Sequence, residues 1–98
     1  MWPFQHQYQQ AREYLQEGLE ISRDIDSKIR IASILQSLGQ LEINCTNYEG
    51  ADEYLQQAEE LANRIDDAHL YGFVLSSLAE MEIGRRKYAR AERYLQKG

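Results

Sequence analysis

The sequence contains little cysteine, proline or glycine, and each shortage excludes a class of protein. One cysteine among 98 residues cannot form an internal disulfide, which excludes a disulfide-stapled secreted mini-protein. One proline and six glycines are too few for a fibrous or linker protein. The longest nearly apolar run, Leu70 to Leu75, is too short to cross a bilayer. The first seven residues lack the basic and apolar regions of a signal peptide, so we expect a soluble chain, most simply in the cytoplasm.

The composition that remains is that of an acidic globular protein. Hydrophobic residues make up 43% and charged residues 28%, with a net charge of -5. The acidic balance argues against a nucleic-acid-binding domain. Residues 85–98 hold six basic residues and one acid, whereas residues 1–84 hold five basic and fifteen acidic residues. This basic end could contact nucleic acid or a membrane surface. We favour the alternative that it complements acidic surface on a neighbouring repeat or a second molecule.

The sequence repeats itself with a period of 40 residues. Comparing 8–47 with 48–87 gives 14 identities in 40 positions without a gap, far more than chance produces. Six of the seven tyrosines fall into two series at this spacing. The series are Tyr8, Tyr48, Tyr88 and Tyr14, Tyr54, Tyr94. A repeat of this length indicates that the chain is built from copies of one supersecondary unit.

Each unit holds two amphipathic helical patterns. Apolar or small residues recur every three or four positions through 48–65 and, on the other helix, through 31–45, which places them on one helical face. Asp26-Ser27 and Asp66-Asp67 are good N-cap pairs, and Thr46 with Glu49 has the spacing of a capping box. We predict helices over 8–24, 28–44, 48–64, 68–84 and 88–97. Their short connections make neighbouring helices antiparallel.

The repeated hairpin resembles a tetratricopeptide repeat. The resemblance rests on Leu35-x-x-Leu38-Gly39, Tyr48-x-x-Ala51 and Leu55-x-x-Ala58, and on a second copy in which Leu75, Leu78-Ala79, Tyr88 and Ala91 take the same places. The period of 40 is longer than the usual ~34. This long variant is similar to repeats of maltose-regulator-like activators and kinesin light chains. The resemblance implies an all-α solenoid of antiparallel helical hairpins.

The repeat frame also predicts the organisation of the domain. We expect one repeat domain over 1–98, with units near 8–27, 28–67 and 68–98, or roughly two and a half repeats. We interpret it as a piece of a longer array whose ends expose apolar stripes, which favours self-association. Trp2 and Phe4 are expected to cover the apolar edge of the first helix pair.

The resemblance implies a concave groove lined by the first helix of each hairpin. On the helix over 28–44 the positions facing it are Ser33, Gln36, Gln40 and Asn44. On the helix over 68–84 they are Phe73, Ser76, Glu80 and Gly84. The alternative interpretation is a plain solvated face. Phe73 favours the groove, because an aromatic residue off the core stripe has little structural reason to be there. The stripe contains no Lys or Arg, so the family subtype that grips terminal carboxylates is not expected.

Catalytic and metal-binding patterns are missing from the sequence. There is no Gly-rich phosphate loop, HExxH or Gly-x-Ser-x-Gly motif. His69 has Asp66 three residues earlier, but two ligands do not make a zinc site. Cys45 lies on the core stripe, where we expect a small buried hydrophobe. The sequence therefore predicts no enzyme, no cofactor and no metal.

Two functions follow as expectations. The first is a non-catalytic scaffold that binds a peptide or partner protein on the concave face. The alternative is a self-association, assembly or spacer module of a larger regulatory protein, which could form a homo-oligomer through the exposed repeat ends. Neither nucleic acid nor membrane is an expected partner.

Overall fold

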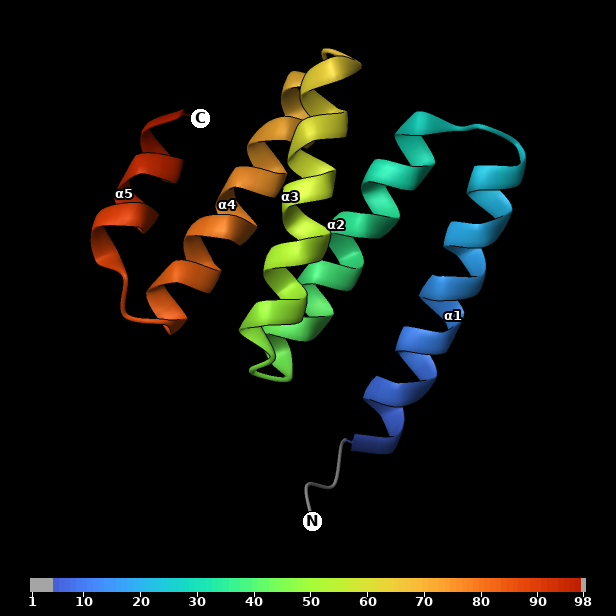
Figure 1. Ribbon diagram of the computed structural model, residues 1–98, viewed down its shortest axis with the longest axis horizontal. Coiled ribbons are helices and arrows are strands. Elements are labelled where there is room, and N and C mark those ends of the chain that lie inside the picture. The colour runs from blue at the N-terminus through green and yellow to red at the C-terminus, as the bar shows by residue number, and fades with distance from the viewer. Residues whose placement is uncertain (1–4, 98) are drawn as a thin grey trace.

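The computed structural model describes residues 5–97 and the side chains of residues 7–97. The described chain is all-α and consists of five helices (Figure 1): α1 Gln5–Asp24, α2 Lys28–Asn44, α3 Tyr48–Arg64, α4 Ala68–Gly84 and α5 Tyr88–Lys97. The bounds predicted for the last four helices are confirmed. The first helix begins at Gln5 rather than at residue 8, because the repeat frame opens at Tyr8 and carries no information about earlier residues. The predicted positions of Trp2 and Phe4 lie outside the described residues.

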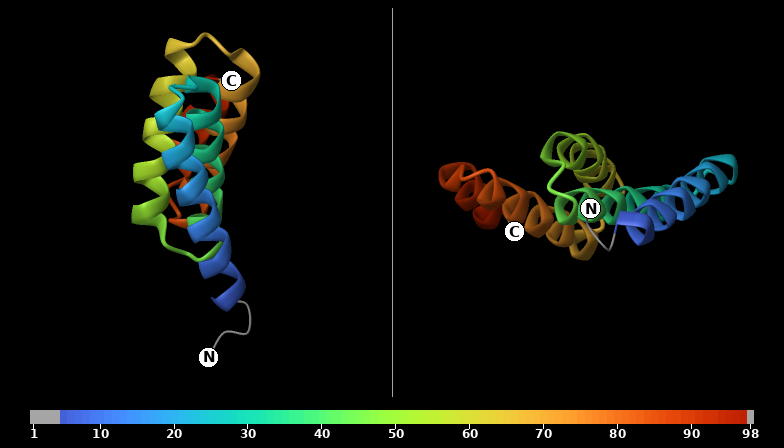
Figure 2. Two further views of the ribbon diagram at one scale, coloured as in Figure 1. Left: turned by 90° about the vertical axis from the view of Figure 1, so that its right-hand side faces the viewer. Right: turned by 90° about the horizontal axis from the view of Figure 1, so that it is seen from below.

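The five helices follow one another across a flat molecule of 38 × 33 × 17 Å, and the chain reverses direction at each connection (Figure 1). Helix α3 packs against both α2 and α4, which also contact each other. Helix α1 packs on α2 and α5 packs on α4. Seen from below, α3 lies on one side of the α2–α4 pair while α1 and α5 form the two ends (Figure 2). The three central helices therefore have neighbours on several sides, whereas each end helix packs mainly against one helix and reaches α3 only through side chains.

The core lies where the predicted stripes of α2, α3 and α4 meet. In α3, Ala51, Leu55, Ala58 and Ala62 are completely buried, as the 3–4 spacing predicts. Of these, Ala51, Leu55 and Ala58 pack in one cluster with Leu35 and Leu38 of α2 and with Leu75, Leu78 and Met81 of α4. A side chain added at Gly39 would overlap Leu55, so glycine lets α2 and α3 approach closely at this level.

Two predictions about single residues are wrong. The N-cap of α3 is Asn47, whose side chain accepts a hydrogen bond from the backbone N–H of Gly50; Thr46 instead belongs to the end of α2, so the capping box does not form. Cys45 is only half-buried. It follows the last turn of α2 at the edge of the core, and the guanidinium Nη2 of Arg12 lies 3.8 Å from its sulfur.

All four connections use the same backbone geometry. Asp26, Thr46, Asp66 and Arg86 have φ between 51° and 63°. After each of them, the next backbone N–H donates to a carbonyl five residues back, as Asn47 does to Glu42 at 2.8 Å. Each α-helix thus ends with one residue in the left-handed region of backbone conformation, a position that is usually glycine. Here none of the four positions is glycine, so each turn carries some backbone strain.

Thr46 carries the most unfavourable side chain for this conformation, because it is β-branched. We expect Thr46→Gly to raise the free energy of unfolding by about 0.5–1 kcal/mol and Tm by roughly 3–6 °C. Asp66→Gly at the repeat-equivalent turn is the control, and its gain is expected to be smaller because aspartate tolerates positive φ. Thermal unfolding followed by circular dichroism measures both. A lower Tm for Thr46→Gly would show that the positive φ of Thr46 does not strain the backbone.

Candidate functional site

The candidate binding site is the face on which α2 and α4 lie side by side. Both are the first helix of their hairpin, and their sequences are related by the 40-residue repeat. Ser37 and Ser77 occupy equivalent positions, and Ser77 is buried. Small side chains at such positions allow two helices to approach closely. As a result, polar side chains of the two helices come within hydrogen-bonding distance across the contact.

Four of these side chains form a hydrogen-bonded ladder. Buried Gln36 donates from Nε2 to Ser77 Oγ at 2.8 Å. Ser77 Oγ donates to Gln40 Oε1 at 3.2 Å, and Gln40 Nε2 donates to Glu80 Oε2 at 2.9 Å. Gln40 Nε2 also lies 3.4 Å from Asn44 Oδ1. The ladder fixes the rotamers of Gln36 and Gln40 and holds α2 and α4 in register.

A shallow hollow of about 290 Å³ opens beside the ladder. Its floor contains Leu15 of α1 and Leu41, and its polar rim contains Gln40 and Asn44. Phe73 of α4 borders the hollow and is 58% exposed. An apolar floor, an exposed aromatic ring and a rim of amides are the elements of a small recognition site.

The eight predicted groove positions do not all come together, and Gly84 lies at the end of α4, against Tyr48 of α3. Gln36, Gln40, Asn44 and Phe73 line the hollow, and Glu80 joins them through the ladder. Gln36 is buried in the α2–α4 contact, so it supports the site from below. Ser33 is half-buried farther along α2, and Ser76 donates to the carbonyl of Gly72 in its own helix at 3.1 Å. Ser77 was missed, although its repetition of Ser37 was a usable signal.

A second polar constellation was missed altogether. Glu42 and Glu82 are repeat-equivalent and both are buried. The Arg12 guanidinium holds the Glu42 carboxylate with two hydrogen bonds, of 2.9 Å from Nε and 3.1 Å from Nη2. The hydrogen bond to Glu42 raises the pKa of Arg12 above its ordinary value, so this cation stays charged.

The second buried carboxylate is held less firmly. Arg85 and Arg90 lie 3.5 Å and 3.7 Å from the Glu82 carboxylate oxygens. Glu82 Oε1 is buried without a hydrogen bond. Position 12 corresponds to Asp52 in the next copy, so α3 cannot supply the arginine that α1 supplies. The cations for Glu82 come instead from the basic end of the chain.

Neither a cluster of metal ligands nor a membrane-spanning helix is found among the described residues. Across residues 7–97, no three His, Cys, Asp or Glu side chains are grouped to hold a metal ion. None of the described helices is long and apolar enough to cross a membrane. Protein-family models, curated proteins and solved structures contain no match to this chain. What the α2–α4 face can bind therefore follows from its own geometry.

Proposed function

We propose that this chain is a non-catalytic protein-interaction module, a tetratricopeptide-like helical repeat that binds a peptide or partner protein on the α2–α4 face. The single observation that supports this most is the hollow bordered by Phe73, Gln40 and Asn44. An exposed aromatic ring next to an apolar floor gives a partner side chain a place to bury. Amide groups at the rim can donate to and accept from an extended peptide backbone.

The repetition of contacts supports the solenoid part of the proposal. Gln16 of α1 donates to the Tyr54 hydroxyl of α3 at 3.4 Å, and Gln56 of α3 donates to the Tyr94 hydroxyl of α5 at 3.1 Å. The two hydrogen bonds are related by the 40-residue repeat. The same contact therefore joins α1 to α3 and α3 to α5, which are the second helices of consecutive hairpins. A solenoid requires such repetition of the contact between neighbouring units. A cytoplasmic location belongs to this proposal, since the free thiol of Cys45 suits a reducing compartment.

The proposed function is tested with peptides selected from a random displayed library against the purified chain. We expect Phe73→Ala to weaken binding of the selected peptides by tenfold or more, because it removes the exposed anchor. Gln40→Ala is expected to weaken it less, by loosening the ladder. Ile29→Ala is the matched control, since Ile29 at the start of α2 is 57% exposed and lies outside the site. Affinities are measured by isothermal titration.

The same peptides can be mapped by NMR through the side-chain amide signals of Gln36, Gln40 and Asn44. The proposal predicts that these signals shift on titration. If selected peptides bind Phe73→Ala and Gln40→Ala as tightly as the unchanged chain, the α2–α4 face is not the binding site.

A further inference from the structure

Helix α1 presents a stripe of carboxylates to solvent. Glu13, Glu17, Glu20 and Asp24 follow one another at steps of four, three and four residues, which keeps them on one helical face. All four are exposed. Of the two arginines of α1, Arg12 is turned inward to Glu42, and Arg23 stands beside the stripe. Tyr14 and Ile21, which are 77% and 54% exposed, flank the stripe on the helix surface. This surface is here called the acidic ridge.

Helix α5 and the turn before it present the opposite charge. Arg86, Arg90, Arg93 and Lys97 are also exposed and also follow one another at steps of four, three and four. Arg90, Arg93 and Lys97 form one wall of a hollow of about 520 Å³ between α3, α4 and α5. This surface is here called the basic wall. The two stripes therefore have the same spacing in sequence and opposite sign; Arg90, Arg93 and Lys97 lie on α5, and Arg86 lies in the turn before it.

The basic wall is only partly neutralised within its own chain. Lys97 lies 3.5 Å from Glu59, and Arg90 lies 3.7 Å from Glu82. Within residues 7–97, the side chains of Arg86 and Arg93 make no ion pair or hydrogen bond. Asp52 also lines the hollow, where its carboxylate accepts from Gln56. A net positive charge remains to attract an acidic partner.

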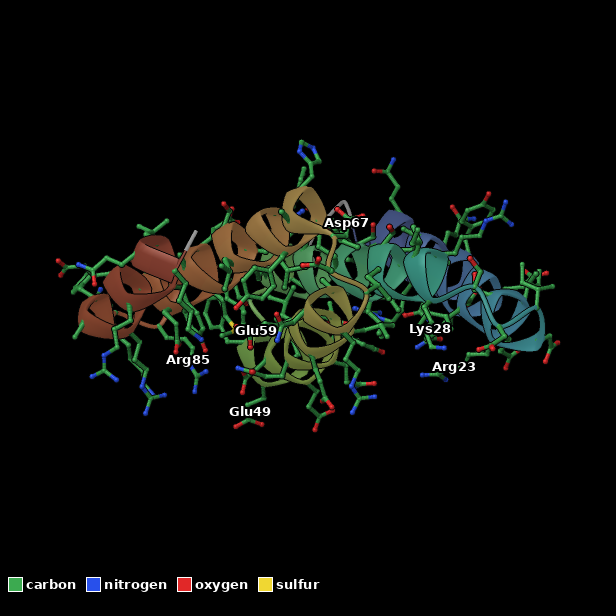
Figure 3. All side chains as sticks on the ribbon, turned by 90° about the horizontal axis from the view of Figure 1, so that it is seen from above. Arg23, Lys28, Glu49, Glu59, Asp67 and Arg85 are labelled. Atoms are coloured by element: carbon green, nitrogen blue, oxygen red, sulfur yellow. The ribbon has the colours of Figure 1, made fainter. Side chains whose placement is uncertain are left out.

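The acidic ridge cannot reach the basic wall within one molecule. Helices α1 and α5 stand at opposite ends of the chain and make no contact with each other (Figure 1). Viewed from above, α5 lies at one end of the molecule and α1 lies at the other (Figure 3). Pairing of the two stripes therefore requires a second molecule.

We propose that the basic wall of one copy receives the acidic ridge of a second copy of this chain. A second copy carries a stripe of opposite charge with the same spacing in sequence, and docking would also cover Tyr14 and Ile21. A nucleic acid or an anionic membrane fits less well, because residues 1–84 hold fifteen acids and five bases and repel a polyanion. The interaction uses neither Phe73 nor Gln40, so it stands independently of the proposed peptide site.

The test exchanges charges that have no ion-pair or hydrogen-bond partner among the described residues. Glu17→Lys/Glu20→Lys reverses two of the four charges of the acidic ridge, Arg86→Glu/Arg93→Glu reverses two of the four charges of the basic wall, and the fourfold variant reverses both pairs of charges. Sedimentation equilibrium is recorded at about 0.02 M and about 0.3 M salt, where screening differs strongly. Circular dichroism verifies that every variant keeps its helices and its Tm, since exposed substitutions change stability little.

We expect the unchanged chain to self-associate at low salt, with a dissociation constant at least about tenfold higher at high salt. Each double variant alone should be weakened by about tenfold or more. An equimolar mixture of the two should form a mixed complex, and the fourfold variant should recover self-association. A chain that is monomeric at both salt concentrations overturns the proposal, as does a fourfold variant that fails to recover. The proposal is also overturned if the chain stays monomeric, its basic wall binds a single-stranded oligonucleotide or an anionic vesicle, and Arg86→Glu/Arg93→Glu abolishes that binding.

Discussion

Leu55→Ala is expected to lower the free energy of unfolding by about 3 kcal/mol, within the range of roughly 2–5 kcal/mol for large-to-small changes in a core. Leu55 has no exposed surface, and it packs on α2 where Gly39 brings the two helices together. Removing three carbon atoms there loses burial and leaves a cavity that close-packed neighbours cannot fill. A domain of this size has only about 5–15 kcal/mol of stability in total.

The repeat supplies a matched control for this substitution. Leu95 occupies the same repeat position in α5 but is 58% exposed, because no described helix covers the far side of α5. Leu95→Ala is therefore expected to cost less than about 1 kcal/mol. Urea unfolding followed by circular dichroism measures both variants at one temperature. Equal losses at the two positions would show that the repeat position, and not its surroundings, sets the cost.

The comparison of Leu55 with Leu95 also explains how far sequence reasoning could reach. Periodicity predicts helices because the spacing of apolar residues is local, and the bounds of α2, α3, α4 and α5 were predicted correctly from it. Periodicity cannot say which copies of a position are covered. Gln36 and Ser76 are repeat-equivalent, yet Gln36 is buried against α4 whereas Ser76 is exposed. The reason is that α4 covers α2, while no described helix covers α4 in the same way.

The candidate site was predictable in outline for the same reason. The stripe containing Gln40, Asn44 and Phe73 follows from helix geometry, and the structure places these residues around one hollow. The ladder did not follow, because Ser77 belongs to a neighbouring stripe of α4 and meets Gln40 only through the crossing of the two helices. The Arg12–Glu42 pair was equally hidden. Its partners are 30 residues apart, and the repeat places an aspartate where the next arginine would stand.

Arg12→Ala is expected to lower the free energy of unfolding by about 2–4 kcal/mol. The cost arises mainly from Glu42, whose side chain is only 5% exposed and would lose its main partner. Asn47 donates to Glu42 Oε1 at 3.3 Å and offsets a small part of this loss. An uncompensated buried carboxylate is more costly than the pair is stabilising, so the effect exceeds what a surface ion pair contributes.

A double-mutant cycle separates that cost from the loss of packing by the arginine stem. Glu42→Gln in the Arg12→Ala background removes the unpaired charge and should restore about 1–2 kcal/mol of the free energy of unfolding. The resulting coupling energy is well above the ~0.5 kcal/mol expected of independent sites.

Arg90→Ala is the matched control. Arg90 is 57% exposed and 3.7 Å from Glu82, which keeps Arg85 as a partner, so the substitution should lower the free energy of unfolding by less than about 1 kcal/mol. A coupling energy near zero would mean that Glu42 is stabilised by its backbone surroundings and that Arg12 contributes only through packing. A large coupling would show that α1 is joined to the hairpin of α2 and α3 by charge as well as by the apolar contacts of Leu15 and Leu19.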